Sequence, residues 1–149
     1  MSYNDARPVK ITIMSLPAHL PVVRAAVEKA CKIVGFQDET AGSIVLSVDE
    51  ALTNIIKHAY KGADDREIEV ELGILGDPPE VLKVRIRDYG VYVDPSQIKS
   101  RDLKDVRPGG LGVHIMTECM DRVQFSPAEG GGTLLTLTKR LPAKQETVQ

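Results

Sequence analysis

The chain is poor in cysteine, in aromatic residues and in long apolar runs. Its 149 residues include two cysteines, and aromatic side chains make up 4 %. Cys31 and Cys119 both stand among apolar neighbours in segments of helical period, so buried thiols are expected rather than a disulfide or a redox pair. Two cysteines and three histidines without close spacing also disfavour a zinc site.

The charge balance disfavours nucleic acid as a direct partner. The formal net charge is −2, whereas binding to the phosphate backbone of nucleic acids is favoured by a basic protein surface. The N-terminal segment MSYNDARPVK lacks the apolar core of a signal peptide. No apolar run approaches the roughly 18 to 20 residues that a membrane span needs. We therefore expect a cytoplasmic protein with no membrane association and no nucleic-acid contact.

Length and periodicity predict one domain over residues 1–149, with an ordered core over about 9–141 and frayed ends. Alternating apolar residues predict strands over 9–15, 67–75, 81–88, 122–126 and 133–140. Steps of three and four residues predict helices over 21–34, 38–60 and 111–120, with Asp38 capping the second. Residues 89–110 are expected to form a loop. This order predicts an α+β two-layer sandwich: a mixed, mostly antiparallel sheet with about three helices on one face.

The second predicted helix carries a carboxylate and a carboxamide on one face. Glu50 and Asn54 are four residues apart and therefore stack on the same side of the helix. Ser43 and Ser47 fall on that side too, opposite the apolar stripe, so this face is expected to meet solvent or a ligand. A base and a metal ligand are one interpretation of the pair, and a solvated helix face is the other.

Asp88 ends a predicted strand in which side chains alternate between two faces, and it has the same parity as Leu82, Val84 and Ile86. That parity places a carboxylate on the buried face, which is costly unless a partner is present. Such a group suits an amino group like adenine N6, and Gly90 would let the backbone approach a flat ring. A turn capped by Asp88 is the alternative.

A glycine-rich segment, Gly109-Gly110-Leu111-Gly112, precedes the third predicted helix. Such a loop can direct several N–H groups at a phosphate. It is neither a Walker A loop, since no Gly-Lys-Ser/Thr follows, nor a dinucleotide fingerprint, since the third glycine would fall at Ile115. A flexible turn is the alternative. At 131–133, Gly-Gly-Thr is by default a hairpin turn.

Four segments together carry a family resemblance over nearly the whole chain: SVDEALTNIIKHAYKG, RIRDYGVYVDP, RPGGLGVHIMTECMDRVQF and GGTLLTLTKRL. In order and spacing they resemble the Bergerat-fold (GHKL) ATPases, and most closely the bacterial anti-sigma-factor serine kinases. One departure stands out: Tyr92 occupies the position of the second glycine of the family's Asp-x-Gly-x-Gly motif. It is expected to reshape the rim of the nucleotide pocket.

The resemblance implies a role for each matching residue. Glu50 corresponds to the general base, and Asn54 to the side chain that holds Mg²⁺ at the ATP phosphates. Asp88 corresponds to the aspartate that recognises the adenine amino group, with Gly90 beside it. The remaining matches are the lid residues Gly110, Leu111 and Gly112, whose N–H groups meet the phosphates, the aspartate-supporting Thr133, and Arg107, for which phosphate contact is one option.

The resemblance also implies an activity. It is that of an ATP- and Mg²⁺-dependent serine kinase that acts as an anti-sigma factor, phosphorylating an anti-anti-sigma protein and sequestering a sigma factor. Relatives often dimerise, so a homodimer stays open. A regulatory module that binds nucleotide without turnover and a plain ATPase in which Glu50 activates water are the alternatives. A histidine-kinase catalytic domain fits less well, since no helix with a phospho-acceptor histidine precedes the domain.

Overall fold

A computed structural model describes residues 7–91 and 108–143, with residues 108–113 described by their backbone alone. Tyr92 and Arg107, singled out above, lie outside the described residues. The elements run in the order β1 (Val9–Met14), η1 (Pro17–His19), α1 (Leu20–Val34), α2 (Asp38–Asn54), η2 (Ile55–Ala59), β2 (Glu67–Leu75), β3 (Val81–Asp88), α4 (Pro108–Cys119), β4 (Arg122–Pro127) and β5 (Thr133–Arg140).

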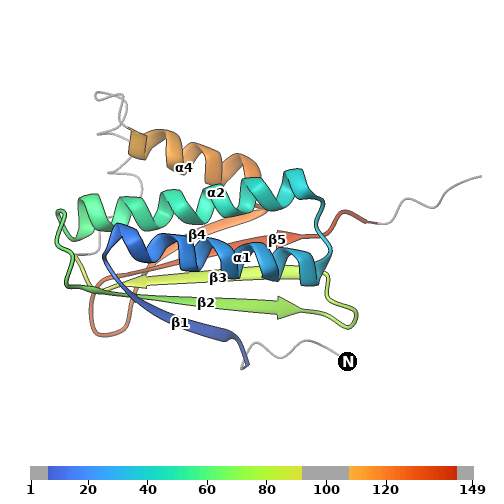
Figure 1. The fold of residues 1–149 in the computed structure, drawn as a ribbon, viewed down its shortest axis with the longest axis horizontal. Helices are drawn as coiled ribbons and strands as arrows, with labels where there is room; N and C mark the ends of the chain where they lie inside the picture. Colours follow the sequence, from blue (N-terminus) through green and yellow to red (C-terminus); the bar gives the residue numbers. More distant parts are fainter. Residues whose placement is uncertain (1–6, 92–107, 144–149) are drawn as a thin grey trace, which may run out of the picture.

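The strands form one sheet in the order β1-β2-β3-β5-β4, and each neighbouring pair is antiparallel. The helices α1, α2 and α4 lie on one side of this sheet (Figure 1). The predicted α+β two-layer fold is therefore confirmed. The central pairing joins β3 to β5, two strands that α4 and β4 separate in the chain, and its register sets Asp88 opposite Thr133.

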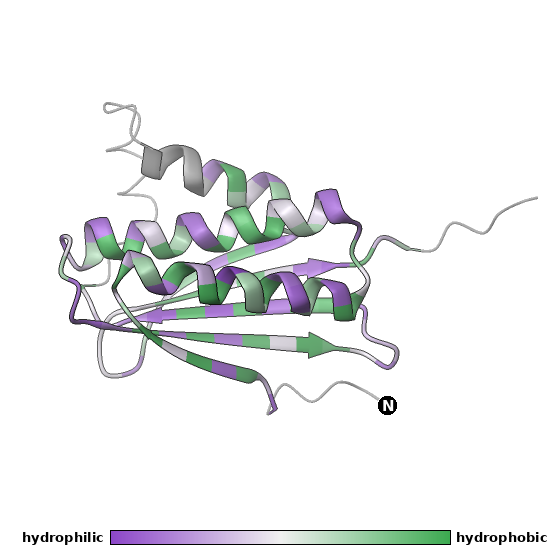
Figure 2. Ribbon diagram, viewed as in Figure 1, coloured by the Kyte–Doolittle hydropathy of each residue, from purple (hydrophilic) through white to green (hydrophobic). Residues whose placement is uncertain are grey.

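The core lies between the helices and the inward face of the sheet. Along β2 and β3, apolar side chains alternate with polar ones (Figure 2). On β3, Leu82, Val84 and Ile86 are at most 1 % exposed. They share one hydrophobic cluster with α1 and α2 residues such as Val27 and Leu52. Burial of each such side chain is worth about 1.5 to 3 kcal/mol relative to exposure.

The second helix differs from its prediction at both ends. Gln37 occupies the N-cap position, and Asp38 lies in the first turn, where its charge favours the positive end of the helix. Regular α-helix ends at Asn54 and continues as the π-helical turn η2, in which the Tyr60 N–H reaches the Ile55 carbonyl at 2.9 Å. Such wide turns are rare and often accompany functional sites.

The predicted solvent face of the second helix is wrong at Ser47. This side chain is 0 % exposed, and its hydroxyl donates to the Ser43 carbonyl at 2.9 Å. The physical reason is that α2 packs against α4 as well as against α1 and the sheet. Two neighbouring helices widen the buried surface beyond the single stripe that periodicity predicts.

The predicted boundary between the loop over 89–110 and the third helix is also wrong. The helix α4 begins at Pro108, so the four residues from Gly109 to Gly112 form its first turns. Proline suits this position, since it lacks the N–H that the first turn leaves unpaired. A helix start leaves its first N–H groups without partners inside the helix. The glycine-rich segment therefore presents backbone donors at a helix N-terminus instead of in a loop.

Both thiols are free, and the predicted burial is complete at Cys31 but only partial at Cys119. Cys31 is fully buried and Cys119 is half-buried. Burial raises the pKa of Cys31 to about 11, with the neighbouring Cys119 adding to the shift. None of the helices among the described residues is long and apolar enough to span a membrane.

Candidate functional site

The end of the helical segment and the end of β3 meet at the Tyr60 side chain. Tyr60 follows η2 and is 6 % exposed. Its hydroxyl accepts a hydrogen bond from the Tyr89 N–H at 2.7 Å and donates one to the Glu67 carbonyl at 2.5 Å. Burial is the main reason that its pKa is raised. One side chain thus joins the helical segment, the start of β2 and the residue after Asp88.

Gly90 lies against the last residue of η2. A Cβ atom placed on Gly90 would sit 3.0 Å from the Ala59 Cβ and 3.1 Å from the Ala59 carbonyl oxygen. Both distances are shorter than nearly all real contacts of that kind. A side chain here would separate the end of β3 from the helical segment. Packing therefore favours glycine at this position, independently of any ligand.

Asp88 is buried as its parity predicts, with 5 % of its surface exposed. Its Oδ1 accepts the Gly90 N–H at 2.9 Å, and the nearby Thr133 N–H also favours the charged carboxyl group. Burial raises the pKa of Asp88, and these two N–H groups and the Arg87 charge partly offset that rise. Because a carboxylate has about four lone-pair positions, Asp88 retains capacity for another donor.

Gly132 is a site residue that sequence reasoning missed. Its φ is +87°, and a Cβ atom on it would lie 2.0 Å from the Asp88 carbonyl oxygen. No side chain fits there, so the glycine lets the turn before β5 pack on the backbone of Asp88. The three consecutive glycines before Thr133 were the available signal, but a hairpin turn was the default interpretation.

Glu50 and Asn54 are both half-buried and share one side of α2 near its C-terminal end. Among the described residues, no hydrogen bond joins either side chain to Asp88. The backbone of Gly110, Leu111 and Gly112 begins α4, which packs against α2. The structure therefore places Gly90 and Thr133 each next to Asp88. The helix with Glu50 and Asn54 leads into η2, whose last residue, Ala59, lies against Gly90.

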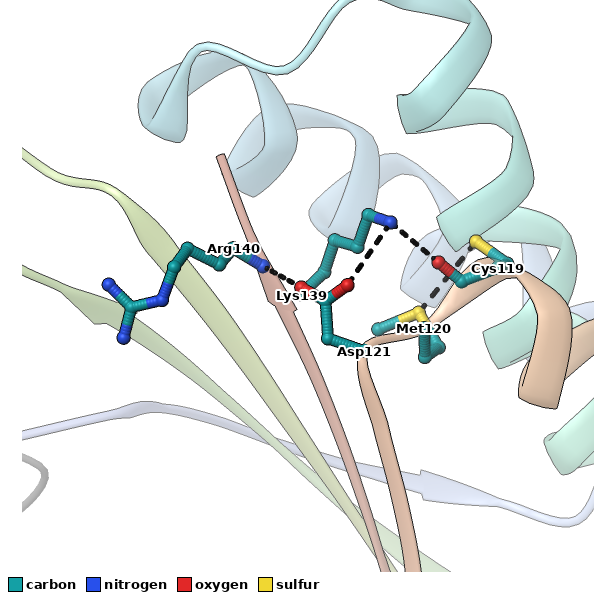
Figure 3. A network of polar contacts seen from close by, with 5 residues as sticks. All are labelled: Cys119, Met120, Asp121, Lys139 and Arg140. Atoms are coloured by element: carbon teal, nitrogen blue, oxygen red, sulfur yellow. Dashed lines mark hydrogen bonds and ion pairs between the residues drawn. The ribbon is translucent and has the colours of Figure 1, made fainter. Parts of the chain in front are cut away.

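The C-terminal end of α4 is fastened to β5 by a polar network (Figure 3). Lys139 Nζ donates to the Cys119 carbonyl at 2.8 Å and lies 3.5 Å from Asp121 Oδ1. The other carboxylate oxygen of Asp121 accepts the Arg140 N–H at 2.7 Å. A cation at the last carbonyls of a helix is favourable. The helix whose first turns hold the glycine-rich segment is thus fixed at its opposite end.

Comparison with known proteins decides the family. The profile described as a histidine kinase-like ATPase domain matches residues 13–139, which is nearly the whole described chain. The chain belongs to this family. The family match covers the helix with Glu50 and Asn54, the Asp88 strand end, the glycine-rich start of α4 and Thr133.

Serine-protein kinases align over most of the chain. A serine-protein kinase RsbW from Listeria monocytogenes serotype 4a (strain HCC23) is 33 % identical over 137 residues, covering 85 % of each protein. A serine-protein kinase RsbW from Bacillus subtilis (strain 168) is 26 % identical and covers 93 % of this chain and 88 % of its own. These relatives are protein kinases of nearly the same length.

Solved structures share the fold at lower identity. The RsbU and RsbW domains of a Mycobacterium tuberculosis protein match with a TM-score of 0.65 and 21 % identity, covering 96 % of this chain and 35 % of that longer one. The SiaB–SiaC complex from Pseudomonas aeruginosa matches with a TM-score of 0.60 and 13 % identity, covering 88 % and 87 %. At these identities the likeness concerns the fold.

Proposed function

We propose that the chain is an ATP-dependent protein serine kinase that acts as an anti-sigma factor in the cytoplasm. The observation that carries this proposal is the buried Asp88 carboxylate, held by two backbone N–H groups at the end of β3 beside the helix with Glu50 and Asn54. The relatives named serine-protein kinase support the reaction type.

Adenine recognition rests on Asp88. An ionised carboxylate is an acceptor only, so it pairs with the exocyclic amino group of adenine and rejects a carbonyl at that position. Gly90 leaves the adjacent backbone without a side chain, and Thr133 holds the carboxyl group through its N–H. Burial strengthens this bond, since the competing water is absent.

The phosphates are assigned to the start of α4. Backbone N–H groups of Gly110, Leu111 and Gly112 lie in its first turns, where a helix offers unpaired donors and a partial positive charge. Asn54 supplies a neutral oxygen ligand for Mg²⁺. Phosphate oxygens and water would supply the other ligands, as is usual for Mg²⁺ at nucleotides.

Glu50 is assigned the proton-accepting step. The hydroxyl oxygen of a substrate serine bonds to the γ-phosphorus as the bond from that phosphorus to the β,γ-bridging oxygen breaks. ADP leaves with the electron pair, and Glu50 takes the hydroxyl proton. Mg²⁺, when bound, offsets the charge that develops on the phosphates. By family resemblance the serine belongs to an anti-anti-sigma protein, and a sigma factor is the second partner.

The direct test uses γ-labelled ATP and a candidate anti-anti-sigma protein. We expect transfer of label to a serine, lost by at least about a hundredfold in Glu50→Ala because a positioned base contributes about that much or more. ATP affinity should stay within about twofold, since Glu50 contacts the incoming hydroxyl and not the nucleotide. Transfer by Glu50→Ala at the wild-type rate would reject the assigned base.

One second candidate is a sigma-factor-binding module in which nucleotide is a structural ligand. Tyr92, at the position of the second motif glycine, favours this reading, since a tyrosine does not comfortably adopt glycine-only backbone angles. A stable complex with a sigma factor in the presence of ATP, together with no labelled serine on any anti-anti-sigma protein, would favour the module over the kinase.

A further inference from the structure

We propose that Arg87 is a positioning residue for adenine selectivity, holding the β4–β5 turn (residues 128–132) from the face of the sheet opposite the helices. The proposal rests on the proposed function, since it concerns how the assigned adenine carboxylate, Asp88, is kept in place. Arg87 and Asp88 are neighbours on β3, so their side chains point to opposite faces. Arg87 cannot touch a nucleotide on the Asp88 side and acts through the backbone.

The guanidinium of Arg87 is tied to the turn by two hydrogen bonds. Its Nη2 atom donates to the Glu129 carbonyl at 2.6 Å and to the Gly131 carbonyl at 3.1 Å. Hydrogen bonds from a charged donor are about twice as strong as neutral ones. The turn contains three glycines in succession with positive φ, a backbone with little intrinsic preference for one shape. Two backbone hydrogen bonds close the turn on itself, from the Ala128 N–H to the Gly132 carbonyl at 3.0 Å and from the Gly131 N–H to the Ala128 carbonyl at 3.1 Å. The Arg87 anchor adds the contact that fixes the closed turn relative to β3.

The anchor is itself held in place. The Arg87 guanidinium lies over the Tyr89 ring, with Cζ 4.3 Å from the ring centre. The Tyr89 hydroxyl donates to Glu69 Oε1 at 2.7 Å, which fixes the ring. The Nε atom of Arg87 is buried without a hydrogen-bond partner among the described residues. An arginine that leaves one donor unpaired is costly, so the two bonds to the turn and the stacking must compensate for it.

The turn transmits this position to Asp88 through its last glycine. Gly132 packs so closely on the Asp88 carbonyl that no Cβ fits between them. Thr133 follows directly, lies opposite Asp88 in the β3–β5 register, and its N–H favours the charged form of the carboxyl group. A displaced turn would therefore move one of the two N–H donors that orient the carboxylate. The base selectivity of the site should fall before its affinity for triphosphate does.

The test compares ATP with inosine triphosphate, which carries a carbonyl where adenine has the amino group. Wild-type protein should bind ATP at least about tenfold more tightly, since one hydrogen bond to a charged group separates the two. In Arg87→Ala, titration calorimetry should show this ratio reduced by about five- to tenfold. The affinity for inosine triphosphate should change by less than about twofold, because its phosphate contacts do not involve Asp88.

Two further variants separate position from charge. Arg87→Lys keeps the positive charge but has a shorter side chain and no planar group to stack on Tyr89. It should lose most of the selectivity; full rescue by lysine would overturn the positional role and leave only an electrostatic one. Arg85→Ala removes a guanidinium from the same strand face, 4.0 Å from Glu71. Its ATP preference should equal that of the wild type, and a loss as large as in Arg87→Ala would also overturn the proposal.

Hydrogen exchange gives an independent reading that does not need nucleotide. The Thr133 amide should exchange faster in Arg87→Ala, whereas the Leu137 amide, farther along β5, should keep its protection. Equal acceleration along all of β5 would mean general destabilisation and would count against the proposal. A wild-type protein that binds ATP and inosine triphosphate equally would instead remove the Asp88 assignment, so failure of the proposed function is recognised before any variant is made.

Discussion

The hydroxyl of Tyr60 lies 2.7 Å from the backbone nitrogen of Tyr89, 29 residues away in the chain. Tyr60 ends the helical segment that carries Asn54, and Tyr89 follows the buried Asp88. The same hydroxyl donates to the Glu67 carbonyl. A single oxygen therefore satisfies two backbone groups and fixes the distance between the two halves of the proposed site.

Replacement of this hydroxyl should be costly. Tyr60→Phe leaves the Tyr89 N–H and the Glu67 carbonyl without their partner at a buried position, so we expect the free energy of unfolding to fall by about 1 to 3 kcal/mol. Urea denaturation measures the change. Tyr89→Phe is the matched control, since it also removes one phenolic hydroxyl, from a ring that is 42 % exposed. Equal losses in the two variants would contradict the prediction.

Two adjacent glycines allow the close approach at Asp88 to be measured. Gly131 and Gly132 both have positive φ, +108° and +87°, but a Cβ on Gly131 meets nothing within 4 Å. Gly131→Ala should cost about 1 to 2 kcal/mol for the backbone angle alone. Gly132→Ala adds the collision with the Asp88 carbonyl oxygen and should be clearly less stable. Thermal unfolding of the two variants measures the difference in stability. Similar melting temperatures would contradict the prediction and show that the turn can move away from Asp88.

The ionisation of Asp88 should set part of the pH dependence of stability. Burial raises its pKa above the ordinary value of 3.8. A folded state with the higher pKa holds the proton more tightly than the unfolded state, so this stabilisation is complete below pH 3.8 and is lost as the pH rises through the raised pKa. Asp88→Asn cannot ionise. Its free energy of unfolding relative to the wild type should therefore increase with pH in urea titrations; a decrease would contradict the sign of the shift.

The role of Asn54 predicts a specific dependence on Mg²⁺. Wild-type affinity for ATP should rise when Mg²⁺ is added and fall on chelation. Asn54→Ala removes the assigned oxygen ligand and should lose about tenfold in affinity with Mg²⁺ present, close to the worth of one good ligand contact. With chelator present, the two proteins should bind ATP equally. A deficit that persists in chelator would assign Asn54 to the nucleotide itself instead of the ion.

Local periodicity was sufficient for the strands and for the burial of Asp88. The bounds 67–75, 81–88 and 133–140 agree with the observed β2, β3 and β5. Alternation is a local signal, and parity alone places Asp88 on the inward face. These predictions needed no knowledge of which strands are neighbours.

Features that depend on contacts between distant segments were not predicted. Glycines are poor helix formers, yet residues 109–112 are helical at the start of α4, which packs against α2. The same packing buries Ser47, which its own helix places opposite the apolar stripe. Gly132 is constrained by its contact with Asp88, a residue 44 positions earlier in the chain. No local pattern records such a contact.

The pairing of Asp88 with Thr133 also bears on synthesis of the protein. A nascent chain that has emerged as far as α4 already carries Glu50, Asn54, Asp88 and the glycine-rich segment. It lacks the strand whose first residue, Thr133, lies opposite Asp88 and whose Lys139 bonds to the end of α4. If the residues have the proposed roles, β5 must emerge from the ribosome before the nucleotide site is complete. ATP capture would then mark a finished kinase domain, and an incomplete chain would neither hold nucleotide nor transfer phosphate.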